Sequence, residues 1–112
     1  MTNQELFDIV SAHLLKQGKK SMSGNGECLY RGPSGLKCAI GCLIPDDRYT
    51  PELEGVNACG DQVSQAAGLD STNTDLVRHL QILHDEKDVY TWHEELKLLG
   101  KEYGLDTSKV PA

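Results

Sequence analysis

The stretch TNQELFDIVSAHLLKQG, residues 2–18, is the clearest secondary-structure element in this sequence. Thr2 and Glu5 stand three positions apart, the spacing at which each side chain accepts a hydrogen bond from a backbone N–H at the start of a helix. Gly18 is a typical residue to end one. The residues at helical spacing between them are Leu6, Ile9, Val10, His13 and Leu14. We therefore expect a helix over residues 2–18 with one buried face.

Two helices are expected in the middle of the chain. A short helix near residues 61–67 would be closed by Gly68, because glycine is favoured just after a helix end. A longer helix, capped by Ser71 or Asn73, would run through residue 84. Its apolar stripe consists of Leu76, Leu80 and Leu83.

A last helix is expected to begin at Thr91, because Thr91 and Glu94 have the spacing of a second capping box. Gly104 would end this helix. Its apolar stripe consists of Trp92, Leu96 and Leu99. We expect residues 1–105 to form one globular domain and residues 106–112 to be a loose tail.

The segment between residues 28 and 44 is harder to assign. Residues 28–37 place two short apolar stretches about a Gly/Pro turn, which favours a short β-hairpin. Residues 38–44 form an apolar run that fits either a buried strand or a short buried helix. We favour the helix, because Ala39 is a helix former and Pro45 gives a stop, and Gly41 would let another backbone pack close. The expected fold is mainly α (α+β), with about five helices packed around one short β-hairpin.

Length and charge exclude several classes of protein. One hundred and twelve residues suffice for one domain, and 17 acidic against 11 Lys and Arg residues give a net charge of −6. This balance argues against duplex DNA as a partner, because phosphate contacts need a basic face. No apolar run approaches the roughly 18 residues needed to cross a bilayer, and residues 1–5 lack the order of a signal peptide. We expect an acidic cytoplasmic protein without a membrane partner, and the sequence is compatible with a homodimer.

The four cysteines, Cys28, Cys38, Cys42 and Cys59, predict neither a disulfide framework nor a metal site. The chain lacks an export signal, so the reducing cytosol is the expected compartment. Zinc sites favour paired close spacings such as C-x2-C, whereas the one close pair here is C-x3-C and the four histidines are scattered. We expect no metal and no cofactor.

A cysteine nucleophile is an alternative reading of Cys38. This residue follows Lys37 and can open a helix, a setting that lowers the pKa of a thiol. The best base would be His84 with Asp85, but these chain neighbours are expected to point in different directions. We therefore favour a buried Cys38 that packs in the core, and we assign no catalytic residue.

Positive charge is concentrated in residues 16–38, which hold five cations and one acid, a net +4 against −10 for the rest. Glycine-rich loops and Lys or Arg side chains are the parts from which anion sites are made. A solvated loop that offsets the acidic helices is the alternative. The candidate ligand-binding residues are Lys19, Lys20, Ser21, Arg31, Ser34, Gly35 and Lys37, and the ligand would be a nucleotide or another phosphorylated small molecule.

Two motifs resemble a known group of proteins. LKCAIGCL at residues 36–43, followed by His84-Asp85 and then Trp92, resembles small uncharacterised proteins of bacteriophages and bacteria. Those proteins share a Cys-Ala-(Ile/Leu)-Gly-(Ala/Cys)-Leu core helix and a late (Asn/His)-Asp…Trp segment. The likeness covers most of residues 5–104. The family has no assigned catalytic residues, so none is carried over to this chain.

The resemblance implies an accessory protein of phage or prophage origin, active in the cytoplasm of the host cell. We expect a non-catalytic protein that binds a host factor or sequesters an anionic, nucleotide-like small molecule, with counter-defence as one such role. Two alternatives stay open. The first is a small cysteine-dependent hydrolase or transferase using Cys38, and the second is a purely structural or interaction protein.

Overall fold

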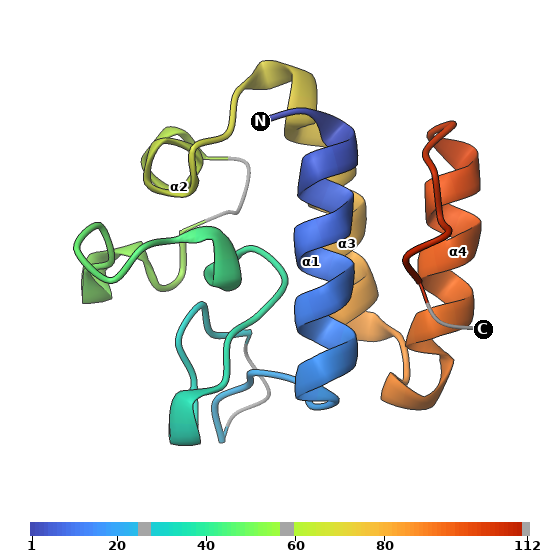
Figure 1. Cartoon of the computed structure of the whole chain (residues 1–112). Coiled ribbons are helices and arrows are strands. Elements are labelled where there is room, and N and C mark those ends of the chain that lie inside the picture. The colour runs from blue at the N-terminus through green and yellow to red at the C-terminus, as the bar shows by residue number, and fades with distance from the viewer. Residues whose placement is uncertain (25–27, 57–59, 111–112) are drawn as a thin grey trace.

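Four α-helices and five 3₁₀ turns are the regular elements of the residues that this computed structural model describes, 1–24, 28–56 and 60–110. The helices are α1 (Asn3–Gln17), α2 (Asp61–Ala67), α3 (Thr74–Glu86) and α4 (Trp92–Glu102). The 3₁₀ turns are Pro33–Gly35, Gly41–Leu43, Pro51–Leu53, Ser71–Asn73 and Val89–Thr91. In Figure 1, α1 lies against α3 with α4 beside them, while α2 and the loop-rich middle of the chain lie on the other side. None of the described helices is long and apolar enough to span a bilayer.

The core lies between α1, α3 and α4, and the predicted stripes form it. Each stripe residue is at most 8% exposed: Leu6, Val10, Leu14, Leu76, Leu80, Leu83, Trp92, Leu96 and Leu99. The stripe of α1 differs from the prediction at one position, because Ile9 is 45% exposed and Phe7 is fully buried in its place. Phe7 lies beside the Leu6–Val10–Leu14 face, whereas Ile9 is turned toward solvent.

Helix ends follow the predicted signals at α1 and at the end of α4. Both hydrogen bonds of the Thr2–Glu5 capping box are present, and Gly18 adopts a left-handed conformation after α1. At the other end of the chain, the backbone N–H of Leu105 donates to Gly100 across the left-handed Gly104.

The predicted cap at Thr91 is wrong. Its side chain makes no capping bond to α4, and its hydroxyl donates instead to the backbone carbonyl of Asp88. The Asp88 carboxylate accepts the N–H of Tyr90 and so opens a 3₁₀ turn that runs directly into the helix. The cap therefore falls one turn earlier than the sequence pattern indicated. Ahead of α3, the Asp70 side chain likewise caps a 3₁₀ turn that runs directly into the helix.

The predicted β-hairpin is also wrong. The described residues contain two isolated antiparallel bridges and no strand; they join Met22 to Cys28 and Arg31 to Lys37. Side-chain oxygens accept hydrogen bonds from the backbone N–H groups that a longer β-ladder would use. The N–H groups of Tyr30 and Arg31 donate to the Glu54 carboxylate at 2.8 and 3.0 Å, and that of Lys37 donates to Gln17 at 2.9 Å.

Residues 38–44 do not form the predicted α-helix. They contain only the 3₁₀ turn Gly41–Leu43, and Ile44 has extended backbone angles. The residue before a proline is disfavoured in the helical region, so Pro45 prevents the turn from growing into a helix. The number of α-helices among the described residues is therefore four instead of five.

Gly41 makes the close backbone approach that the sequence predicted. A Cβ atom at this position would overlap the backbone carbonyl of Tyr30. Gly41→Ala should therefore destabilise the protein by about 1–3 kcal/mol or more, the cost of overpacking, in chemical denaturation. Gly24→Ala is the matched control, because its Cβ would meet no atom within 4 Å. Equal stability of the two variants would contradict the close contact.

The segment after α4 does not behave as a loose tail over residues 106–110. The Gln4 side chain donates to the backbone carbonyl of Asp106 and accepts its N–H, at 2.9 and 2.8 Å. Lys109 pairs with Asp8 at 3.4 Å, and Val110 is 5% exposed. Burial of one apolar side chain and pairing of the backbone hold this segment on α1. Residues 111 and 112 lie outside the described residues, as do Cys59 and residues 25–27.

Truncation of a stripe residue tests the shared core. Leu80→Ala and Leu96→Ala should each lower the free energy of unfolding by about 2–5 kcal/mol, because each leaves a cavity in a fully buried site. Ile9→Ala, on the exposed side of α1, should change stability far less. Near-neutral values for both leucines in chemical denaturation would mean that the three stripes do not share one core.

Candidate functional site

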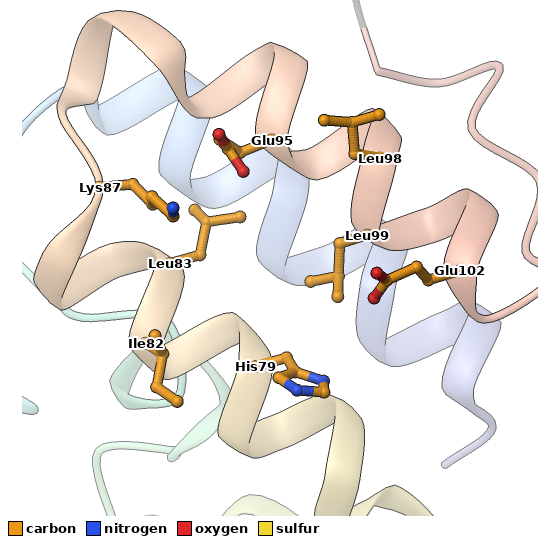
Figure 2. A pocket seen from close by; sticks show the side chains of 8 residues that line it. All are labelled: His79, Ile82, Leu83, Lys87, Glu95, Leu98, Leu99 and Glu102. Carbon is orange, nitrogen blue, oxygen red and sulfur yellow. The ribbon is translucent and has the colours of Figure 1, made fainter.

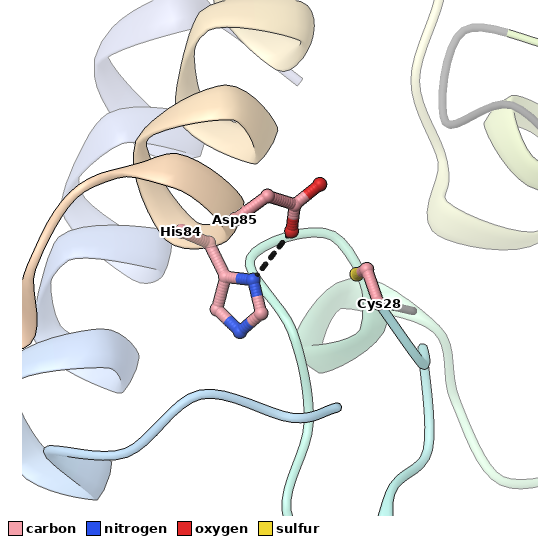
Figure 3. Close-up of side chains that lie close together, drawn as sticks. All are labelled: Cys28, His84 and Asp85. Carbon is pink, nitrogen blue, oxygen red and sulfur yellow. Dashed lines mark hydrogen bonds and ion pairs between the residues drawn. The ribbon is translucent and has the colours of Figure 1, made fainter. Parts of the chain in front are cut away.

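The side chains of Cys28, His84 and Asp85 come together where the end of α3 meets the loop-rich part of the chain (Figure 3). One potential metal-ligand atom of each side chain lies within 4.8 Å of those of the other two. His84 is fully buried, while Cys28 and Asp85 are half-buried. It is the one group of three such side chains in the described part of the chain, which makes it the candidate site.

His84 is fixed by hydrogen bonds at both ring nitrogens. Its Nδ1 lies 2.7 Å from Oδ1 of Asp85, and its Nε2 lies 3.0 Å from the backbone N of Ser21. A backbone N–H can only donate, so Nε2 must accept and the proton of the neutral ring sits on Nδ1. The expectation that His84 and Asp85 point in different directions is therefore wrong.

Gln81 explains why the Asp85 carboxylate turns back toward the histidine. Its amide nitrogen donates to Asp85 at 2.9 Å and to the sulfur of Cys28 at 2.8 Å. The N–H of Ile40 donates to the amide oxygen at 3.4 Å, which fixes the orientation of the amide. Gln81 was not singled out by the sequence reasoning. Its signal is the i,i+4 spacing to Asp85, which places both side chains on one face of α3.

The thiol of Cys28 is hydrogen-bonded to a second thiol, that of Cys38. The Cys28 thiol donates a hydrogen bond to Cys38, and this bond, together with burial, raises the pKa of Cys28. Burial by itself raises the pKa of the Cys38 thiol, but the hydrogen bonds from Cys28 and from the N–H groups of Gly41 and Ile40 outweigh it and lower that pKa. The hydrogen bond therefore holds the Cys28 proton between the two sulfurs.

The cluster holds the ligand types that zinc prefers. Its hydrogen bonds, however, place protons where a metal ion would have to bind. A metal could bind Nδ1 of His84 only if the ring proton moved to Nε2, where the N–H of Ser21 already donates. The amide nitrogen of Gln81 also lies between the sulfur of Cys28 and the Asp85 carboxylate, where a cation would sit. The residues present do not fit a metal centre.

The arrangement also lacks what a cysteine nucleophile needs. A nucleophilic thiol requires a base within reach and access for the substrate. Both nitrogens of His84 are engaged elsewhere, and Cys38 is fully buried, as the sequence predicted. His79 lies apart, exposed on α3, where its Nδ1 contacts the hydroxyl of Tyr103 at 2.5 Å. The cluster therefore joins α3 to the loop-rich segment and offers no evident catalytic base.

Arg31, the main phosphate-gripping residue of the predicted anion site, is engaged inside the protein. Its guanidinium pairs with Asp46 at 2.7 Å and donates to the backbone carbonyl of Ile44 at 2.9 Å. It also lies over the ring of Tyr49, 4.7 Å from the ring centre. The guanidinium of Arg31 is therefore engaged within the protein by an acidic side chain, a backbone carbonyl and an aromatic ring, while its buried Nε has no hydrogen-bond partner among the described residues.

The remaining candidates are distributed over buried and exposed positions. Ser21 is fully buried, and its hydroxyl donates to the backbone carbonyl of Leu29 at 2.7 Å. Ser34 and Gly35 are exposed in the turn that follows Gly32. These candidates therefore divide between a buried serine and an exposed turn.

The lysines, in contrast, are brought together at the end of α1. The Gln17 amide donates to the backbone carbonyls of Lys19 and Lys37, at 2.7 and 2.8 Å. His13 is half-buried and also contacts the Lys37 carbonyl, at 2.9 Å. Lys20 lies beside them and donates from Nζ to the backbone carbonyl of Asp85 at 3.1 Å. We call Lys19, Lys20 and Lys37 the lysine surface.

No family model matches this chain, and no significant match is found among curated proteins or solved structures. The late His-Asp…Trp motif does come together in space, because the rings of His84 and Trp92 lie 5.7 Å apart. The buried indole N–H donates to the carbonyl of Lys87 at 3.2 Å. The resemblance to phage and bacterial proteins stays a prediction.

The Asp85 carboxylate should stabilise the fold only while it is ionised. Burial alone raises its pKa, but the hydrogen bonds from His84 and Gln81 outweigh burial and hold that pKa below its usual range. Because the folded-state pKa is the lower one, the contribution is complete above the unfolded-state pKa of about 4 and is lost as the pH falls through the folded-state value. Asp85→Asn should cost about 1–3 kcal/mol at pH 7.

This cost should shrink in urea unfolding as the pH is lowered from 5 toward 2. Glu86→Gln is the control, because Glu86 is the exposed neighbour of Asp85 on α3. A stability difference between the wild type and Asp85→Asn that is the same at every pH would contradict an ionised, hydrogen-bonded carboxylate.

Proposed function

We propose that this protein is a non-catalytic accessory protein of phage or prophage origin that acts by binding an anionic partner. The partner would be a host factor with an acidic surface or a nucleotide-like small molecule, including one that carries a defence signal. The lysine surface would contact the negative group. Ser34 and Gly35 lie in an exposed turn of the same basic segment.

One observation carries the proposal. The single side chain of Gln17 binds the backbones of Lys19 and Lys37, which are 18 positions apart, and so holds two cations at the same end of α1. Among the described residues, none of the three lysines forms an ion pair with an acidic side chain. Clustered cations without acidic partners repel one another, and a bound anion would relieve that repulsion.

The hydrogen bonds of His84 support the non-catalytic part of the proposal. A thiol enzyme would need an imidazole nitrogen that can take a proton from sulfur. Here the N–H of Ser21 occupies one nitrogen and Asp85 the other. Binding is therefore the activity that the geometry supports best.

Calorimetry against mono-, di- and cyclic nucleotides and inorganic pyrophosphate tests the proposal directly. We expect binding that weakens as salt rises, because the contacts are exposed charges. The double variant Lys19→Ala/Lys37→Ala should weaken binding by roughly 10-fold or more, about 1.4 kcal/mol.

Lys101→Ala is the matched control, because Lys101 is an exposed lysine in the last turn of α4. Arg31→Ala should act differently and lower stability, since its guanidinium has internal partners. Absence of heat with every anion, together with an unchanged melting temperature in millimolar phosphate, would contradict small-anion binding and leave a host protein as the partner.

A further inference from the structure

Cys28 and Cys38 lie next to each other although a turn separates them in the chain. The antiparallel bridge between Arg31 and Lys37 joins the two sides of that turn, with Cys28 before it and Cys38 directly after it. The Cys28 thiol donates a hydrogen bond to the Cys38 sulfur, which also accepts the backbone N–H of Gly41 at 3.3 Å. Two free thiols therefore face each other within one chain.

The two sulfurs differ in their access from solvent. Cys28 is half-buried, whereas Cys38 is fully buried. The groove of about 250 Å³ between α3 and α4 does not open onto them, because the side chains that line it belong to other residues (Figure 2). A small oxidant therefore reaches the pair at the exposed part of Cys28.

Gln81 holds the Cys28 sulfur in place. Its amide nitrogen donates to that sulfur at 2.8 Å, and its amide oxygen accepts the N–H of Ile40, two residues beyond Cys38, at 3.4 Å. One side chain of α3 thus contacts both segments that carry these cysteines. A hydrogen bond donated to sulfur also favours the thiolate, which is the form that reacts with oxidants.

We propose that Cys28 and Cys38 form a redox-sensitive pair, which a hydroperoxide converts into an intramolecular disulfide. The thiols already make contact, so the bond needs only a local rearrangement to the S–S distance of about 2.05 Å. In a reducing compartment both cysteines stay as thiols, and disulfides there are transient or redox-sensing. The inference concerns the cluster at the end of α3 and does not depend on the proposed function.

The reaction balances with one hydroperoxide molecule. With hydrogen peroxide, the Cys28 sulfur attacks one oxygen, the O–O bond breaks, and the thiol proton leaves with the other oxygen as water. The Cys38 sulfur then attacks the sulfenic sulfur of Cys28, and the hydroxyl group leaves with the Cys38 proton as a second water molecule. The two thiols lose two electrons, which the peroxide gains.

Cys42 provides the comparison within the same segment, because it is also half-buried. Its thiol donates to the backbone carbonyl of Ala39 at 3.1 Å, and burial raises its pKa to about 12. We therefore expect Cys42 to stay reduced in a chain whose Cys28 and Cys38 are oxidised.

Mapping of the thiols in the full chain, after treatment with a small molar excess of hydrogen peroxide, tests the pair. Free thiols are alkylated in denaturant, and the chain is digested without reduction for mass spectrometry. We expect two peptides linked through Cys28 and Cys38, lighter by two hydrogen atoms than the separate peptides together, which dithiothreitol separates. Because the bond closes residues 28–38 into a covalent loop, the oxidised protein should melt higher than the reduced one, by roughly 5 °C.

Three variants separate the parts of the two cysteines. Cys38→Ala should leave a sulfenic acid on Cys28 that dimedone labels, because the thiol that would displace the hydroxyl is missing. Cys28→Ala should leave Cys38 as a thiol, since Cys38 is fully buried. Cys42→Ala is the matched control and should still form the disulfide. Circular dichroism shows whether each variant is folded.

A wild type in which Cys28 and Cys38 both stay alkylatable, under conditions that fully oxidise glutathione, would overturn the proposal. So would linkage of either residue to a different cysteine or to a second chain. An oxidised form that melts no higher than the reduced one would contradict the closed loop.

Discussion

The hydrogen bond from the backbone N–H of Ser21 to Nε2 of His84 joins the two parts of this molecule. One part is the bundle of α1, α3 and α4, and the other is the loop-rich middle of the chain, which has few backbone ladders of its own. The bond is buried at 3.0 Å and sets the tautomer of His84, which in turn determines that Nδ1 donates to Asp85. The same choice of tautomer removes both the metal-binding and the proton-accepting capacity of the imidazole. One backbone donor therefore settles which chemistry this cluster can perform.

The parts of the fold that the sequence predicted correctly depend on local signals. The box of Thr2 and Glu5 and the left-handed Gly18 are defined by residues within one turn, and the leucine stripes follow from helical spacing. The hairpin does not form because its backbone donors bond to Glu54 and Gln17, which lie 24 and 20 positions away along the chain. Sequence patterns carry no signal for such side-chain acceptors.

The same distinction between local signals and long-range contacts applies to the candidate site. Arg31 was grouped with the lysines by its position in the chain, but Asp46, Ile44 and Tyr49 occupy its guanidinium. Cys28 and Gln81 are 53 positions apart, so nothing in the sequence indicated their contact. The i,i+4 spacing of Gln81 and Asp85 was visible, but many such pairs occur on solvated helix faces, and burial decides which of them matter.

The hydrogen bond between Gln4 and Asp106 joins residues that are 102 positions apart in the sequence. During synthesis α1 leaves the ribosome well before α4 and the segment at residues 106–110, which lies on α1, are made. At about 5–20 residues per second, the apolar face of α1 waits on the order of ten seconds for these partners. The nascent helix is thus exposed to chaperones and to other nascent chains during this interval. A substitution that destabilises α4 would lengthen this exposure. Its first effect in a cell would be a lower yield of folded protein, before any change in partner binding.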